Sequence, residues 1–167
     1  MQNIKTNIHT ISVLVANKPG VLVRIALVFA RRGYNIDSLV VSPTINPKFS
    51  RMTITAKGDL ETLDQIIKNA NKLIDVIHCE EHDLTHTVEK ELALLKIKAS
   101  PAAKTFITKY SRKFHVKIDD TSEKYFIIEQ TGTTSALDEF EALVRKYGVV
   151  EMVRTGKILM AKGKEKT

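Results

Sequence analysis

The spacing of the apolar residues changes at one short turn near the N-terminus, and this change constrains the fold more than any other feature. From Ile8 to Val15 the apolar residues alternate, with the period of two that a β-strand requires. From Val21 to Arg32 they recur at the three- and four-residue steps of an amphipathic helix. The intervening Asn17-Lys18-Pro19-Gly20 is therefore predicted to be a tight turn from a strand into a helix.

A turn that opens a helix has groups that can hold an anion. The first N–H groups of a helix lack intrahelical acceptors, and the helix dipole makes this end partially positive. Gly20 would let a ligand approach the backbone, Pro19 sets φ in the turn, and the Asn17 amide could cap the helix or contact the ligand. Ordinary connecting turns have the same composition, so the turn alone leaves both interpretations open.

The other elements of the first half complete the order β-α-β-β-α-β. Gly33 is placed to end the first helix, and Asp59 is placed to cap the second. The predicted strands are 8–15, 34–41, 51–57 and 76–79, and the predicted helices are 21–32 and about 60–73. This order is that of a ferredoxin-like α+β domain, a four-stranded antiparallel sheet with two helices on one face. That fold hosts many functions and does not select one.

A similar order of elements returns in the second half. Ser100 is an N-cap before Pro101, Thr134 or Ser135 is expected to cap a later helix, and Gly148 is placed to end that helix. The predicted strands are 92–99, 116–119, 125–130 and 149–154, and the first helix of this half is expected to run from 101 to about 110. We therefore predict two ferredoxin-like domains, residues 8–82 and 90–163, with a linker at 83–89 and a basic tail at 164–167.

Composition excludes several classes of protein. The 167 residues, 43% of them hydrophobic, suffice for two small cores but include no apolar run long enough to span a bilayer. The N-terminal residues lack the pattern of a signal or transit peptide, so we expect a cytoplasmic protein without membrane association. Cys79 is the single cysteine and cannot form an internal disulfide. The net charge of +7 lies mostly in the second half, where basic residues alternate with acidic ones as on a solvated surface.

Two groups of residues could bind an ion. His78, His82 and His86 fall four residues apart around Cys79, but a strand followed by a linker would not bring them together, so we expect no metal site. The arginines 31, 32 and 51 could bind phosphate, although such residues are more often solvated or paired with carboxylates.

Enzymatic and RNA-binding functions find little support. The sequence has no nucleophile elbow, no phosphate-binding loop and no His/Cys pair with local support, so we expect no catalytic residues in this chain. Ferredoxin-like RNA readers place aromatic side chains on a central strand, and residues 51–57 have none. We therefore expect no nucleic-acid partner.

Three segments of the first half together resemble a known family. They are Val13-Leu14-Val15-Ala16-Asn17-Lys18-Pro19-Gly20-Val21-Leu22, Arg31-Arg32-Gly33-Tyr34-Asn35-Ile36-Asp37-Ser38-Leu39 and Ser50-Arg51-Met52-Thr53-Ile54. The second half adds Thr131-Gly132, Leu137-Asp138-Glu139-Phe140 and Gly148-Val149-Val150-Glu151-Met152-Val153-Arg154-Thr155-Gly156. The chain is similar over nearly its whole length to the small regulatory subunits of acetolactate synthase, also called acetohydroxyacid synthase, which begin with an ACT domain.

The resemblance implies a regulatory subunit without catalytic activity. Such a subunit would dock on a catalytic subunit, activate it and make it sensitive to valine or a related branched-chain amino acid. Thiamine diphosphate, Mg²⁺ and FAD would belong to that partner, and no cofactor is expected in this chain. It also implies a homodimer through the ACT domains, with the effector between two protomers. A free-standing amino-acid sensor is the alternative, and the match of the second half argues against it.

The resemblance places the effector at the turn. The effector carboxylate would meet the N–H groups of Gly20, Val21 and Leu22. Asn17 and, from the neighbouring protomer, Asn35 and Ile36 would close the site, with Val21 and Ile36 as the apolar wall. An amino acid suits such a site, because its carboxylate fits the helix end and its ammonium fits amide oxygens or carbonyls.

Overall fold

The computed structural model describes residues 7–164 and 167, which divide into two units. One unit comprises the described residues up to 88 and those from 159 onward, and the other comprises residues 89–158. Both units have the predicted ferredoxin-like architecture, and we describe each by itself.

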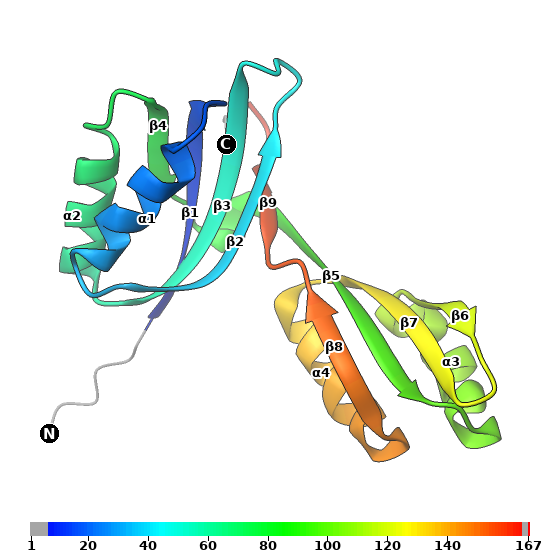
Figure 1. Ribbon diagram of the computed structural model, residues 1–167. Helices are drawn as coiled ribbons and strands as arrows, with labels where there is room; N and C mark the ends of the chain where they lie inside the picture. The colour runs from blue at the N-terminus through cyan, green and yellow to red at the C-terminus, as the bar shows by residue number, and fades with distance from the viewer. Residues whose placement is uncertain (1–6, 165–166) are drawn as a thin grey trace, which may run out of the picture. The chain divides into compact units, whose positions relative to one another are not determined.

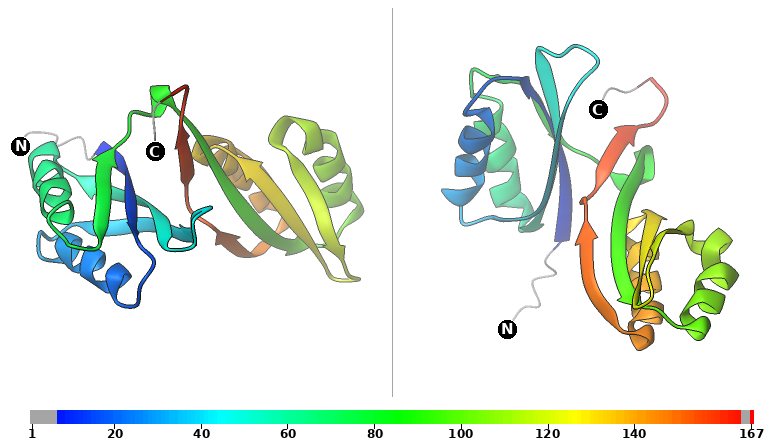
Figure 2. Two further views of the ribbon diagram at one scale, coloured as in Figure 1. Left: turned by 90° about the horizontal axis from the view of Figure 1, so that it is seen from above. Right: turned by 45° about the vertical axis from the view of Figure 1, so that its right-hand side comes forward.

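The first unit is a four-stranded antiparallel sheet with two helices on one face (Figures 1 and 2). Its strand order is β2-β3-β1-β4, so β2 and β4 are the edges. The elements are β1 (Asn7–Ala16), α1 (Val21–Ala30), β2 (Asn35–Pro43), β3 (Phe49–Gly58), α2 (Leu60–Ala70) and β4 (Val76–Glu81). The β-α-β-β-α-β order predicted from periodicity is confirmed.

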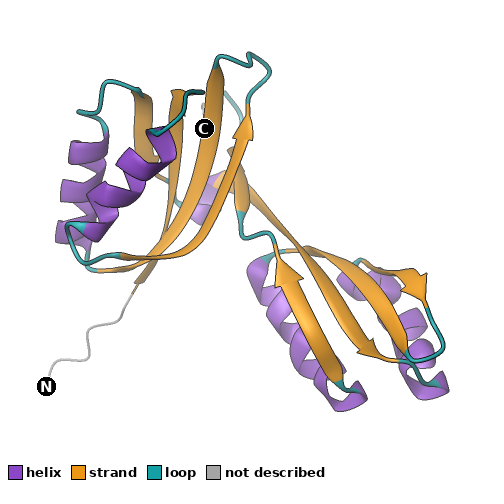
Figure 3. Cartoon of the chain, in the orientation of Figure 1, coloured by secondary structure: helices purple, strands orange, loops and turns teal. Residues whose placement is uncertain are grey.

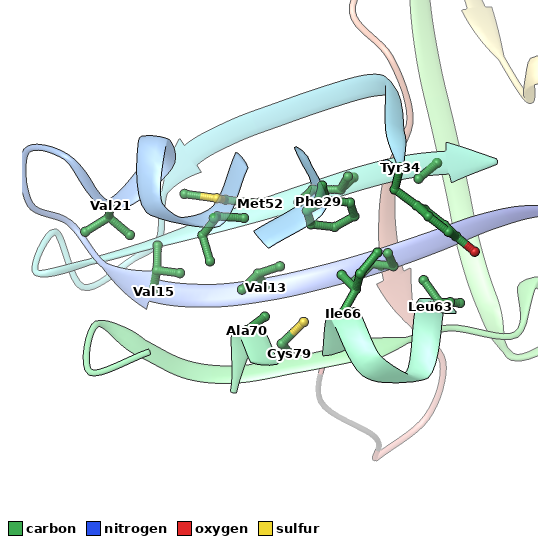
Figure 4. Packing of buried hydrophobic residues seen from close by; sticks show 14 residues of the cluster. Val13, Val15, Val21, Phe29, Tyr34, Met52, Leu63, Ile66, Ala70 and Cys79 are labelled. Carbon is green, nitrogen blue, oxygen red and sulfur yellow. The ribbon is translucent and has the colours of Figure 1, made fainter. Parts of the chain in front are cut away.

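The alternating residues of β1 explain how this unit packs. Val13 and Val15 lie on the face of β1 that the helices cover and pack in one cluster with Phe29 and Met52 (Figure 4). These side chains are at most 2% exposed. Burying each one contributes about 1.5–3 kcal/mol relative to leaving it in water. Neither α1 nor α2 lies on the opposite face of the sheet (Figure 2).

Capping side chains decide where α2 begins and ends. The Asp59 carboxylate accepts a hydrogen bond from the Thr62 N–H at 2.8 Å, as predicted for an N-cap. The helix ends at Ala70, three residues earlier than predicted, because Asn71 bonds the next strand. Its side-chain amide donates to the Cys79 carbonyl at 2.8 Å and accepts from the Cys79 N–H at 2.9 Å.

The second unit has the same order of elements, and both of its helices lie on one face of the sheet (Figure 3). Its strand order is β6-β7-β5-β8, and β9 also pairs with β5. The elements are β5 (Thr87–Lys98), α3 (Pro101–Phe114), β6 (Val116–Thr121), β7 (Tyr125–Gly132), α4 (Thr134–Val144) and β8 (Val149–Arg154). The single-turn helix η2 (Arg145–Tyr147) also belongs to this unit, whereas the single-turn helix η1 (Leu84–His86) and most of the short strand β9 (Ile158–Ala161) belong to the first.

Three local predictions in this half differ from the structure. Helix α3 continues four residues beyond Tyr110, because Phe114 is buried against Phe140 with ring centroids 5.4 Å apart. Thr133, rather than Thr134 or Ser135, caps α4 by accepting from a backbone N–H at 3.3 Å. Strand β9 was not predicted, and the segment expected to be a linker contains η1 and the start of β5.

Within the described residues, no helix combines the length and the apolar character needed to cross a membrane.

Cys79 should be unreactive in the folded protein. Its side chain is 2% exposed, and burial, assisted by the charge of Glu80, raises the pKa of its thiol to about 12. Because only the thiolate is nucleophilic, alkylation at pH 8 should be about a thousandfold slower than for an ordinary cysteine. Mass spectrometry after timed exposure to a maleimide, in buffer and in denaturant, measures this. Rapid labelling in buffer would contradict the burial of Cys79.

Candidate ligand-binding site

Two hydrogen bonds from Asn17 hold the turn between β1 and α1 in place. The Asn17 N–H donates to the Lys48 carbonyl at 2.7 Å, and the Asn17 side-chain amide donates to the Pro47 carbonyl at 3.0 Å. Gly20 is the N-cap residue, with φ 81° in the left-handed region that favours glycine. Asn17 therefore anchors the turn to the loop before β3, and no side chain caps α1.

The start of α1 presents unused N–H groups. Among the described residues, the backbone N–H groups of Gly20, Leu22 and Val23 have no backbone acceptor, whereas that of Val21 lies 3.4 Å from the Lys18 carbonyl. No acidic residue occupies the first turn of the helix. Three donors at the positive end of the helix dipole can bind a carboxylate without displacing a side chain.

Arg24 adds a positive charge that the sequence analysis did not assign to this turn. A Cβ atom added to Gly20 would lie 3.0 Å from Arg24 Nη1, so the guanidinium lies beside the glycine. The same guanidinium pairs with the Asp75 carboxylate at 2.5 Å. Helical spacing could have indicated this placement, because residues four apart lie on one face of a helix.

The apolar residues at the helix start divide between core and solvent. Val21 is 3% exposed and packs in the core cluster, so within one chain it offers only its backbone. Leu22 and Val23 are 43% and 60% exposed and form the free apolar surface next to the turn. Val23 was not predicted from the sequence to be a site residue, because periodicity does not show which exposed residue lies next to a binding turn.

Asn35 and Ile36 lie at the other end of the first unit. They begin β2, where Asn35 is opposite Lys57, whereas the turn follows the end of β1, where Ala16 is opposite Phe49. The ten residues of α1 separate the two groups by about 15 Å at 1.5 Å per residue. One chain by itself therefore does not bring Asn35 and Ile36 to the turn.

His78, His82 and His86, the three histidines named above as possible metal ligands, line one cavity. Residues 78, 80 and 82 share one face of β4 and its extension, and the Nε2 atoms of His78 and His82 lie 3.2 and 3.5 Å from the Glu80 carboxylate. His86 of η1 lines the same cavity. Across residues 7–164 and 167, no three His, Cys, Asp or Glu side chains are arranged to hold a metal ion.

Known proteins match both units. Residues 11–78 match the family described as the AHAS small subunit-like ACT domain, and residues 90–163 match the family described as the small subunit of acetolactate synthase. The chain is 45% identical over 159 residues to a probable acetolactate synthase small subunit of Archaeoglobus fulgidus, covering 95% of this chain and 99% of the relative. It is 40% identical over 164 residues to that of Methanothermobacter thermautotrophicus, covering 98% of each chain.

The fold matches a solved structure with the same description. The crystal structure of the acetolactate synthase small subunit from Thermotoga maritima superposes with a TM-score of 0.85 at 38% sequence identity. The match covers 95% of this chain and 99% of that one.

Proposed function

Because the chain belongs to the family of acetolactate synthase small subunits, we propose that it activates a catalytic acetolactate synthase subunit and confers feedback inhibition by valine or another branched-chain amino acid. Catalysis would take place in the partner subunit, which would carry thiamine diphosphate, Mg²⁺ and FAD. The observation that carries the effector site is the set of unused N–H groups at the start of α1, beside the Arg24 guanidinium.

A second copy of this chain would complete the site. Strand β2 is an edge of its sheet, and within the described residues it pairs only with β3. Pro43, at the end of β2, lies at the same end of the sheet as the turn, because Pro43 is opposite Ser50 and Ser50 is opposite Val15. Antiparallel pairing of β2 with its copy would bring the partner's Asn35 and the partner's Ile36 to that end. Two equivalent effector sites per dimer follow from the two-fold symmetry.

The bound amino acid would use all three of its groups. Its carboxylate would accept from the free N–H groups of the turn, and the Asn17 side-chain oxygen and the partner's Asn35 would accept from its ammonium. Its aliphatic side chain would lie against Leu22, Val23 and the partner's Ile36. Effector binding across the interface would then shift a pre-existing equilibrium of the dimer, which alters the docked enzyme.

Isothermal titration of the purified protein with valine, leucine, isoleucine and lysine tests this function. We expect saturable binding of the three branched-chain amino acids within a few hundredfold of one another, because one methylene discriminates by only about 1–3 kcal/mol. Lysine should not bind, because its ammonium would be placed against an apolar wall. Equal binding of lysine, or no effect of valine on the reconstituted enzyme, would contradict the proposal.

Mixing this protein with a catalytic acetolactate synthase subunit also distinguishes the proposed regulatory subunit from a free-standing amino-acid sensor. Activation of a catalytic acetolactate synthase subunit on mixing supports the subunit assignment. Binding of branched-chain amino acids without any activation would instead favour a sensor that controls another protein.

A further inference from the structure

The geometry points to a second ligand site in the first unit, a cavity that binds the phosphate group of a small phosphorylated metabolite through Arg51. The cavity has a volume of about 760 Å³. It lies on the face of the sheet opposite α1 and α2, and Gly20 and its neighbours in the turn do not line it. This site does not depend on the proposed effector site.

The register of the strands brings the lining residues together from distant parts of the chain. Leu14 of β1 lies opposite both Arg51 of β3 and His78 of β4, so these three side chains form one row across the sheet. In the next row, Ser12 lies opposite Glu80. His82, His86 and Thr87 close the cavity from the segment that follows β4.

Each acidic side chain that lines the cavity already has a partner. Glu80 lies within 3.5 Å of two imidazoles, and the Glu81 carboxylate pairs with His9 Nδ1 at 2.6 Å. The Asp83 carboxylate accepts from the Thr85 N–H at 2.8 Å, which lowers the pKa of that carboxyl group. Each of these carboxylates is therefore already hydrogen-bonded, and the imidazoles offset the charge of Glu80 and Glu81 when they are protonated.

The positive charge of Arg51 is not compensated in this way. Its Nη1 atom is buried and has no hydrogen-bond partner among the described residues. Burial lowers the pKa of Arg51, and the charge of Glu80 only partly opposes this effect. A buried guanidinium nitrogen without an acceptor is costly, and an anionic oxygen would satisfy it.

The remaining donors favour phosphate among the anions. A phosphate presents three or more strong acceptor oxygens, and the guanidinium can bind two of them side by side. The imidazole of His86 lines the same cavity and can donate to another oxygen. The hydroxyl of Thr87 also lines it, and this hydroxyl donates to the Asp83 and Leu84 carbonyls at 3.4 Å. The cavity is much larger than a phosphate ion, so we expect a phosphomonoester rather than inorganic phosphate.

The other two arginines considered for phosphate provide matched controls. Arg31 and Arg32 follow α1 and are exposed to solvent, and neither lines the cavity. The substitution Arg31→Gln removes the same charge as Arg51→Gln without touching the proposed site.

Calorimetric titration with inorganic phosphate, ribose 5-phosphate and ribose, at constant ionic strength, tests the site. We expect ribose 5-phosphate to bind saturably and ribose not to bind. Arg51→Gln should weaken binding about tenfold to a hundredfold, because a charge-assisted hydrogen bond is lost, and Arg31→Gln should leave it unchanged. Binding of inorganic phosphate alone would support the phosphate site and reject the ester. No saturable binding of either phosphate compound, or equal weakening by both substitutions, would overturn the proposal.

Histidine NMR tests the same site in the unaltered protein, so the result does not depend on the folding of a variant. Each of the five histidines contributes a C2–H resonance. Ribose 5-phosphate should shift the resonances of His78, His82 and His86, and that of His115 in the second unit should stay in place. Unchanged resonances of the three cavity histidines, or an equal shift of His115, would reject the cavity as the binding site.

Discussion

The substitution Gly20→Asp should abolish inhibition by valine and leave activation of the catalytic subunit largely intact. The new carboxylate would occupy the place proposed for the carboxylate of the effector, at the free N–H groups of α1. The added Cβ would lie 3.0 Å from Arg24 Nη1, so the new carboxylate would also pair with Arg24. We expect the valine concentration for half-inhibition to rise by more than about a hundredfold, since two or more charge-assisted hydrogen bonds are lost.

The substitution Gly20→Asn separates this charge effect from backbone strain. Any side chain at φ 81° is strained, but asparagine and aspartate tolerate the left-handed region better than other residues and have nearly the same size. Gly20→Asn should therefore lower valine affinity much less than Gly20→Asp. Inhibition assays on the reconstituted enzyme and calorimetry on the isolated protein compare the two variants. A Gly20→Asp protein that remains fully sensitive to valine would place the effector elsewhere.

The substitution Glu91→Ala should strongly destabilise the second unit. The Glu91 carboxylate is 7% exposed and accepts two hydrogen bonds of 2.9 Å from the Arg154 guanidinium. It also accepts one from the Thr134 hydroxyl at 3.0 Å. Without Glu91, Arg154 would keep its contact of 2.6 Å to the exposed Asp138 but would lose its buried carboxylate partner. Removing one member of a buried pair costs about 3–5 kcal/mol, and we expect about 3 kcal/mol because Asp138 remains.

Hydrogen exchange measures this loss unit by unit. A loss of about 3 kcal/mol corresponds to amide exchange about a hundredfold faster in the strands of the second unit, whereas peptides from residues 7–82 should exchange as before. The matched control is Glu141→Ala, which removes a Glu–Arg pair within α4 and its following turn in which the arginine is 73% exposed and the glutamate 20% exposed. Such pairs contribute about 0.3–0.5 kcal/mol. Equal effects of the two substitutions would show that the Glu91–Arg154 pair stabilises the second unit no more than the Glu141–Arg145 pair does.

Periodicity and capping were sufficient to predict the architecture. The alternation of Ile11, Val13 and Val15 fixes which face of a strand is buried, and the helical spacing after Gly20 fixes the face of α1 that covers it. Asp59 and Ser100 act as the predicted caps, accepting from backbone N–H groups at 2.8 and 3.1 Å. These features depend on residues a few positions apart, so they can be recognised in the sequence without knowledge of the fold.

The helix boundaries and the additional strand depended on contacts that local patterns do not encode. Helix α2 stops early because Asn71 bonds both backbone groups of Cys79, and α3 continues because Phe114 packs against a later helix. Strand β9 is only four residues long, and its pairing with β5 joins segments about 70 residues apart. A short apolar run has no periodicity that distinguishes a strand from a loop.

The sequence by itself determined the fold class, the turn from β1 into α1 and the family of this protein, because each depends on residue types at short, regular spacing. The tertiary structure alone decided which charged side chains share a site. Three arginines looked alike as phosphate ligands, and only the strand register separates Arg51, in a row with Leu14 and His78, from the exposed Arg31. The tertiary structure also placed Arg24 beside Gly20, and it placed Asn35 at the far end of α1. Register and packing join residues that are distant in the chain, and no local pattern records their distances.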